Sequence, residues 1–271
     1  MPPPSDTRRV IGPEESFPFV PESDLAAVRA ASVLGENSSR HDGRALDAVR
    51  PMFLQCGTVA QASGSAYLEL GGTKLLCSVH GPRDTVRRRD FQLTGQVNAE
   101  VKFTPSASRR RRGHQSDCEE NDMSRALTKA MEAAVILERF PKAKVDIHVM
   151  VVEDGGGVLA AAMTAASLAL ADASIDMIDM VAAVSVGFDA HVCIVDPRKE
   201  EEEAIAADNT QWSAMTLAIM PTSGEVVALE QTGQTHTDRC IDAVKAASEA
   251  CMRVHQVQRN TLSCAVRKTS N

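Results

Sequence analysis

Aromatic side chains are the scarcest class in this chain. They make up 3% of its 271 residues, with one Trp and one Tyr. RNA-binding modules that stack bases on a sheet need several exposed aromatic rings, so this scarcity argues against that class of protein. Hydrophobic residues nevertheless make up 44% of the chain. The core must therefore be built from Ala, Val, Leu, Ile and Met, which favour helices packed closely on sheets.

Metal-binding, nucleotide-binding and membrane-spanning patterns are also missing. The seven cysteines are widely spaced, with no C-x-x-C pair or Cys/His cluster, which predicts free thiols in a reducing compartment and no metal site. The pattern G-x-G-x-x-G is absent, so we expect no dinucleotide, and we predict no other cofactor. No apolar run is long enough to span a bilayer, and the N-terminus lacks the apolar stretch of a secretory signal. We therefore expect no membrane association.

Charge is unevenly distributed along the chain. The net charge of −7 argues against a protein that coats nucleic acid over its whole surface. Between Arg83 and Arg112, however, nine cations face three acids, a local balance of 9 − 3 = +6. Two arginine clusters here flank a predicted strand, and we expect them to converge on RNA phosphates. A solvated loop that binds nothing is the alternative. The candidate RNA-binding residues are Arg83, Arg87, Arg88, Arg89, Arg109, Arg110, Arg111 and Arg112.

The order of predicted elements indicates one α+β domain over residues 40–271, with mixed sheets and packed helices. Residues 1–39 are rich in Pro, Ser and acids, which predicts a partly disordered N-terminal extension with a short helical stretch at 25–34. Short β-type runs separated by glycines predict an antiparallel meander: 52–59, 66–70, 74–79 and 97–103. Helical spacing predicts helices over 117–139, 158–173 and 236–265, the second of them buried. Further strands are predicted at 145–152, 181–187, 191–195, 214–220 and 225–229.

Five motifs occur in the order typical of one family. They are RHDGR (40–44), QASGSAY (61–67), GGTKLLC (71–77), GPR (81–83) and EDGG (153–156). In this order, over residues 40–265, the chain resembles the RNase PH superfamily of phosphorolytic exoribonucleases. Within it the chain is most similar to the eukaryotic RNA exosome ring subunits of the Mtr (mRNA transport) type, on residues 11–16, the arginine-rich loop, 152–156 and 195–197.

The resemblance implies a fold and a set of partners. The fold is that of an RNase PH-like domain, of the ribosomal protein S5 domain 2 type. The partners are RNase PH-like sister subunits in a hexameric ring, cap subunits with RNA-binding domains, and RNA. The implied location is the nucleus and nucleolus, and also the cytoplasm.

The phosphate-binding pair of active relatives is missing. The resemblance implies a Thr-Arg or Ser-Arg pair after the Asp-Gly-Gly turn, where a helix N-terminus and a guanidinium hold phosphate. Here those positions are Gly157, Val158 and Leu159, so we predict no catalytic residue. Active relatives also carry two carboxylates suited to Mg²⁺ or proton transfer, and this chain keeps Asp196 and Glu202, which we interpret as a vestigial acidic site. The alternative is that Asp196 caps the turn before Pro197 and that Glu202 belongs to a solvated helix start.

Together these patterns predict a non-catalytic exosome ring subunit. Its role is to scaffold the complex and to line the RNA channel for 3′–5′ RNA processing and decay, including rRNA processing. The main alternative is an active phosphorolytic 3′–5′ exoribonuclease whose site is shared with a partner subunit. A third possibility is a monomeric RNA-binding adaptor outside any ring.

Overall fold

The structure, a computed structural model, describes residues 40, 42–84, 94–108, 111–113, 115–189, 192–207 and 212–269. The predicted extension, 1–39, with its helical stretch at 25–34, lies outside this set. Within the part of the chain that is described, no helix is both long and apolar enough to cross a membrane.

The first sheet has five strands and includes one parallel pair. Its strands are β1 (Met52–Cys56), β2 (Gly64–Leu70), β3 (Thr73–Asp84), β4 (Gln96–Phe103) and β5 (Ala143–Glu153), in the order β1-β2-β3-β5-β4. The predicted four-stranded meander is therefore wrong at its last member, because β4 pairs in parallel with β5 at the sheet edge. A parallel pair needs a crossover, and helix α2 (Cys118–Ala134) supplies it.

Helix α2 is shorter than its apolar pattern predicts. The prediction extended it to Arg139, but it ends at Ala134 and a single 3₁₀ turn, η3 (Leu137–Arg139), follows. Between them Val135 forms an isolated antiparallel bridge with Met177. This pairing uses the backbone in an extended conformation, so the helix cannot continue through it.

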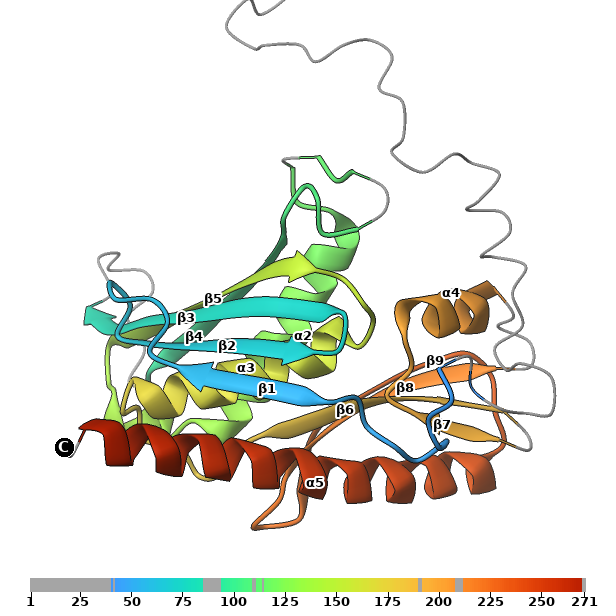
Figure 1. Ribbon diagram of the computed structural model, residues 1–271. Coiled ribbons are helices and arrows are strands. Elements are labelled where there is room, and N and C mark those ends of the chain that lie inside the picture. Colours follow the sequence, from blue (N-terminus) through green and yellow to red (C-terminus); the bar gives the residue numbers. More distant parts are fainter. Residues whose placement is uncertain are drawn as a thin grey trace, which may run out of the picture.

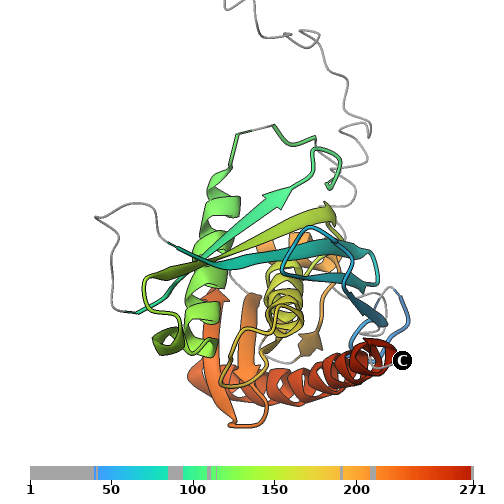
Figure 2. The same cartoon turned by 90° about the vertical axis from the view of Figure 1, so that its left-hand side faces the viewer.

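The second sheet is entirely antiparallel and lies on the other side of a buried helix. Its strands are β6 (Ala182–Phe188), β7 (Cys193–Val195), β8 (Ser213–Met220) and β9 (Glu225–Thr232), in the order β7-β6-β8-β9. Helix α3 (Val158–Asp172) runs between the two sheets, as Figure 2 shows nearly end-on. The long helix α5 (Thr237–Thr269) runs along the molecule and contacts both sheets, and α4 (Lys199–Ala207) lies near the β2–β3 turn (Figure 1).

Helix α3 is buried because its side chains are small and apolar. Twelve of its fifteen residues are buried, which confirms the predicted buried helix. The first sheet approaches it so closely that a Cβ on Gly64 would lie 2.2 Å from the backbone nitrogen of Ala173. Only glycine fits at that contact, which explains the glycine at the start of β2.

The free edge of β4 is covered by polar side chains of α2. Alternate β4 amides donate to α2 residues spaced four apart, a match that arises because four helical residues and two strand residues both advance about 6 Å. The donors and acceptors are Ala99 to Thr128 Oγ1 at 3.1 Å, Val101 to Ser124 Oγ at 2.9 Å, and Phe103 to Glu120 Oε1 at 3.0 Å. This edge of the sheet is therefore closed to further strand pairing.

Candidate functional site

The Asp-Gly-Gly turn is held against the beginning of α4. The Lys199 amide donates to the Gly155 carbonyl at 3.0 Å. Gly156 has φ +97°, and a Cβ there would lie 2.6 Å from the Lys199 nitrogen. Only glycine allows this conformation and this contact. The turn therefore fixes α4, and the residues α4 carries, relative to the N-terminus of α3.

The first residues of α3 supply neither a hydroxyl nor a guanidinium. Gly157 begins the helix with φ 67°, Val158 is buried, and Leu159 lines the adjacent cleft. At these three positions only backbone amides could meet an anion, and that of Gly157 already donates to Glu202. The side chains that active relatives are expected to use for phosphate are absent from these three positions.

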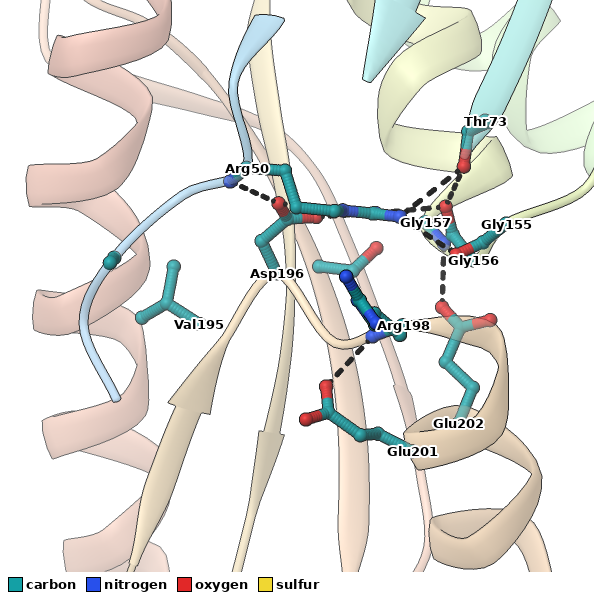
Figure 3. Close-up of polar contacts among 12 residues, drawn as sticks. Arg50, Thr73, Gly155, Gly156, Gly157, Val195, Asp196, Arg198, Glu201 and Glu202 are labelled. Atoms are coloured by element: carbon teal, nitrogen blue, oxygen red, sulfur yellow. Dashed lines mark hydrogen bonds and ion pairs between the residues drawn. The ribbon is translucent and has the colours of Figure 1, made fainter. Parts of the chain in front are cut away.

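An arginine that the sequence reasoning missed fills the space beside this turn. A Cβ on Gly157 would lie 3.1 Å from Nη2 of Arg50. This guanidinium donates to the carbonyls of Gly155 at 2.7 Å and Gly156 at 3.0 Å, and to Thr73 Oγ1 at 3.4 Å. Figure 3 shows it lying between Asp196 and the glycine turn. Arg50 is buried and fully hydrogen-bonded, so it is committed to the protein rather than to a ligand. No motif spacing pointed to Arg50, because its partners lie in segments far apart along the chain.

Asp196 is the other half of that contact. It is 2% exposed and has φ 53°, a left-handed conformation that is costly for a non-glycine residue. Its Oδ2 accepts the backbone N–H and Nε–H of Arg50, at 2.8 and 2.9 Å, and its Oδ1 lies 2.6 Å from Arg50 Nη2. Both carboxylate oxygens therefore hold the chain segment before β1.

The RHDGR motif holds the same turn from the other side. Arg40 donates to the carbonyls of Val195 and Asp196, at 2.8 and 2.9 Å, and its Nη2 lies 2.7 Å from Oε2 of the buried Glu201. The acidic run at 200–203 is therefore only partly solvated, because one of its members is a buried structural partner.

Glu202 faces the beginning of α3. Its Oε1 accepts the Gly157 amide at 2.7 Å (Figure 3). Burial raises the pKa of the Glu202 carboxyl to about 7, although the Gly157 amide, Lys199 and Arg50 favour its charged form. Asp196 and Glu202 thus both border Gly157, but only Glu202 lines the cleft there.

The cleft at the N-terminus of α3 is strongly acidic. Its volume is about 530 Å³. Five carboxylates line it against one ammonium: Glu119, Asp122, Asp154, Glu202 and Glu230 against Lys199. The Lys199 ammonium lies 2.9 Å from Asp154 Oδ2, so it is already neutralised. Two of the acids are paired as well, Glu119 with Arg112 and Asp122 with Arg125, so the excess negative charge that a free anion meets in this cleft comes from Glu202 and Glu230. The described residues contain no group of three or more His, Cys, Asp or Glu side chains arranged to hold a metal ion.

The predicted RNA-binding arginines are only partly described. Arg83, Arg111 and Arg112 belong to the described chain, whereas Arg87, Arg88, Arg89, Arg109 and Arg110 lie outside it. Arg83, on β3, pairs with Lys144 of β5. Lys144 in turn pairs on its other side with Gln96, the first residue of β4. Arg112 lies with its guanidinium 3.9 Å from the centre of the Phe103 ring, at the last residue of β4.

The described arginines near the two clusters, Arg83 and Arg112, lie at opposite ends of β4. The eight-residue strand β4 separates Arg83 from Arg112 by about 23 Å. Arg112 is also tied to Glu119, 3.0 Å from its Nη2, and is only 14% exposed. Arg83 and Arg111 are exposed. The convergence of the two clusters therefore stays a prediction, since most of their arginines lie outside the described residues.

Comparison with known proteins decides the family. Residues 48–176 match domain 1 of the 3′ exoribonuclease (RNase PH) family, and residues 179–250 match its domain 2. The chain belongs to the RNase PH family. It is 36% identical over 281 residues to exosome complex component MTR3 of Homo sapiens, covering 98% of this chain and 97% of the human protein. It is 32% identical over 232 residues to exosome complex component Rrp41 of Thermoplasma volcanium, covering 85% of this chain and 91% of that protein.

Solved structures of RNase PH-family proteins share the fold. Rice Rrp46 superposes with a TM-score of 0.72 at 21% identity, over 82% of this chain and all of that one. The Archaeoglobus fulgidus exosome with RNA bound to the active site superposes with a TM-score of 0.71 at 19% identity. The match covers 87% of this chain and 96% of the archaeal one. The predicted α+β RNase PH-like fold is confirmed, as is the resemblance to the Mtr type drawn from the motifs.

Proposed function

We propose that the chain is a non-catalytic subunit of an RNA exosome ring. It scaffolds the ring together with RNase PH-like sister subunits and cap subunits, and it helps to line the RNA channel. Similarity over nearly the whole chain to the human exosome component MTR3 supports ring membership. The fold shared with an RNA-bound archaeal exosome supports proximity to RNA.

The acidic cleft at α3 carries the non-catalytic part of this proposal. Phosphorolysis requires an inorganic phosphate held in line with the last phosphodiester and charge stabilisation of the transition state. In this chain the cleft lacks a free cation among its lining residues, and Asp196 is occupied by Arg50. Positioning and charge stabilisation, the main contributions of such a site, are both missing.

The test is to measure nucleoside diphosphate release from RNA in the presence of phosphate. The chain is assayed alone and in a ring reconstituted with its sister subunits. We expect no release by the chain alone and no change in the ring when Glu202→Gln replaces the natural residue. Release by the chain alone contradicts the proposal.

The channel role rests on exposed cations that contact RNA without sequence preference. Arg111 is the clearest described candidate, because it is exposed in the segment that connects β4 to α2. In the reconstituted ring we expect Arg111→Ala to weaken RNA binding, with a shallower dependence of affinity on salt. The control is Arg125→Ala, an exposed arginine on α2 paired with Asp122. Equal effects of the two variants contradict the channel role.

One observation favours a second candidate, an active site completed by a partner. The cleft stays open beside Gly157, and both Asp196 and Glu202 border that residue. An arginine from a sister subunit entering the cleft would supply the missing guanidinium. Diphosphate release by the purified pair of subunits, lost on Glu202→Gln with the fold intact, supports this candidate.

We also propose that the chain acts in the nucleus and nucleolus, and in the cytoplasm, in RNA decay and rRNA processing. Similarity to a eukaryotic exosome component supports this assignment. Imaging of the tagged chain should show it in the nucleus, the nucleolus and the cytoplasm. Depletion of the chain should cause 3′-extended rRNA precursors to accumulate.

A further inference from the structure

The beginning of α3 already carries a carboxylate. Backbone amides in the first turn of a helix have no partner within it, and together with the helix dipole they attract anions. Here the leading amide, that of Gly157, donates to Glu202 Oε1 at 2.7 Å. Glu202 comes from a different helix, 45 positions away along the chain.

Glu202 is held in this position by the way α4 is attached. The Lys199 amide donates to the Gly155 carbonyl, and the Glu202 amide donates to the Arg198 carbonyl at 2.8 Å. The close contact of Gly156 with Lys199 leaves no room for α4 to shift towards the turn. The carboxyl group of Glu202 therefore faces α3 as a fixed part of the fold.

We propose that Glu202 is the chain's own substitute for a bound anion, and that its carboxyl group keeps external phosphate out of the cleft by occupying the N-terminus of α3. This inference rests on the proposed absence of phosphorolysis. A phosphate oxygen and Glu202 compete for the same N–H donor, and they cannot both accept it at hydrogen-bond distance.

The lining around Glu202 holds more acids than cations, although Glu119 and Asp122 are themselves paired with Arg112 and Arg125. Glu119 and Asp122 face it from α2, Asp154 from the turn and Glu230 from β9, and all line the same cleft. Lys199, the cation in the lining, is paired with Asp154. The neighbouring acid on α4, Glu203, lines a separate hollow with Arg44 and Arg198. Among the acids of α4, Glu202 is therefore the one that both lines this cleft and contacts the beginning of α3.

The test is a phosphate titration of the full-length, ¹⁵N-labelled chain followed by NMR. The probes are the backbone amides of Gly157, Val158 and Leu159, and ionic strength is matched with chloride. We expect these amides to respond saturably to inorganic phosphate in Glu202→Ala, with an affinity about tenfold or more above that of the wild type. Glu203→Ala is the matched control, because it removes the same charge from the same helix, and it should behave like the wild type.

Two results overturn the proposal: an equal phosphate response in the wild type, or no response in Glu202→Ala. If Glu202→Ala does not fold, Glu202→Ser replaces it, since its short side chain withdraws the acceptor from the Gly157 amide; a gain in affinity is still expected and its absence counts against the proposal. An equal phosphate response in the wild type and in Glu202→Ala, without diphosphate release, overturns the role of Glu202 and leaves the proposed function standing. Diphosphate release by the wild-type chain overturns the proposed function.

Discussion

Arg50 and Asp196 form a buried ion pair in which the guanidinium reaches both carboxylate oxygens, at 2.9 Å from Nε to Oδ2 and 2.6 Å from Nη2 to Oδ1. The pair joins the segment before β1 to the turn after β7, 146 positions later. Because Arg50 also binds the carbonyls of the glycine turn, three separate stretches of chain meet at one guanidinium.

Breaking this pair should strongly destabilise the protein. Asp196→Ala leaves a buried arginine without its counter-charge, and we expect a loss of about 3–5 kcal/mol in the free energy of unfolding. Urea denaturation measures it. Asp122→Ala, which breaks the exposed pair with Arg125, should cost less than about 1 kcal/mol. Similar losses in the two variants contradict the structural role of Asp196.

Glu202 should make stability fall as the pH rises. Its pKa is about 7 in the folded chain against 4.5 as the ordinary value, so between these pH values the folded state binds more protons than the unfolded state. Its stabilising contribution is thus complete below pH 4.5 and is lost as pH rises through 7. Glu202→Gln should be more stable than the wild type at pH 8, by on the order of 2 kcal/mol, and should show no such gain at pH 4.5.

Unfolding midpoints of the wild type and Glu202→Gln at several pH values provide the measurement. A gain of equal size at pH 4.5 and pH 8, or a loss at pH 8, argues against a raised pKa at this residue.

Arg111 and Arg112 should behave differently despite being neighbours. Arg112 lies over Phe103 and pairs with Glu119, so Arg112→Ala should lower the free energy of unfolding by about 1–2 kcal/mol. Arg111 is exposed, so Arg111→Ala should leave stability within about 0.5 kcal/mol and affect RNA binding alone. Thermal unfolding and RNA titration of both variants separate the two roles; equal destabilisation is the contrary outcome.

The polar stripe of α2 should protect the β4 edge. Ser124→Ala removes the acceptor of the Val101 amide, and we expect a loss of about 1–2 kcal/mol. Hydrogen exchange at Val101 should accelerate while exchange in β2 and β3 stays near the wild-type rate. Ser263→Ala, at an exposed serine that bonds only within α5, is the control. Unchanged exchange at Val101 would mean that another group shields this edge.

The sequence predicted those parts of the fold that depend on local patterns. Alternation identified the strands and their inward faces, and the small apolar residues of 158–172 identified a buried helix. The pairing of β4 with β5 could not be predicted in the same way, because alternation specifies which face of a strand is buried and not which strand lies beside it. The end of α2 was missed for a related reason, since the bridge from Val135 to Met177 is a long-range contact.

The sequence predicted that the candidate site lacks phosphate-binding side chains. It did not predict that Arg50 and Glu202 lie there instead. Gly157, Val158 and Leu159 can be seen in the sequence to carry no phosphate ligand. The role of Arg50 depends on three distant segments meeting. That of Glu202 depends on how α4 docks on the glycine turn. Neither contact has a spacing that a single sequence reveals.

Arg40 and Glu201, paired in the interior, are 161 residues apart. During synthesis at about 5–20 residues per second, roughly ten to thirty seconds pass between the emergence of the arginine and that of its partner carboxylate. The strands of the first sheet are complete by Glu153, yet the segment leading into them cannot be secured until α4 has left the ribosome. A contact that forms only after α4 is made therefore secures the segment that precedes the first strand.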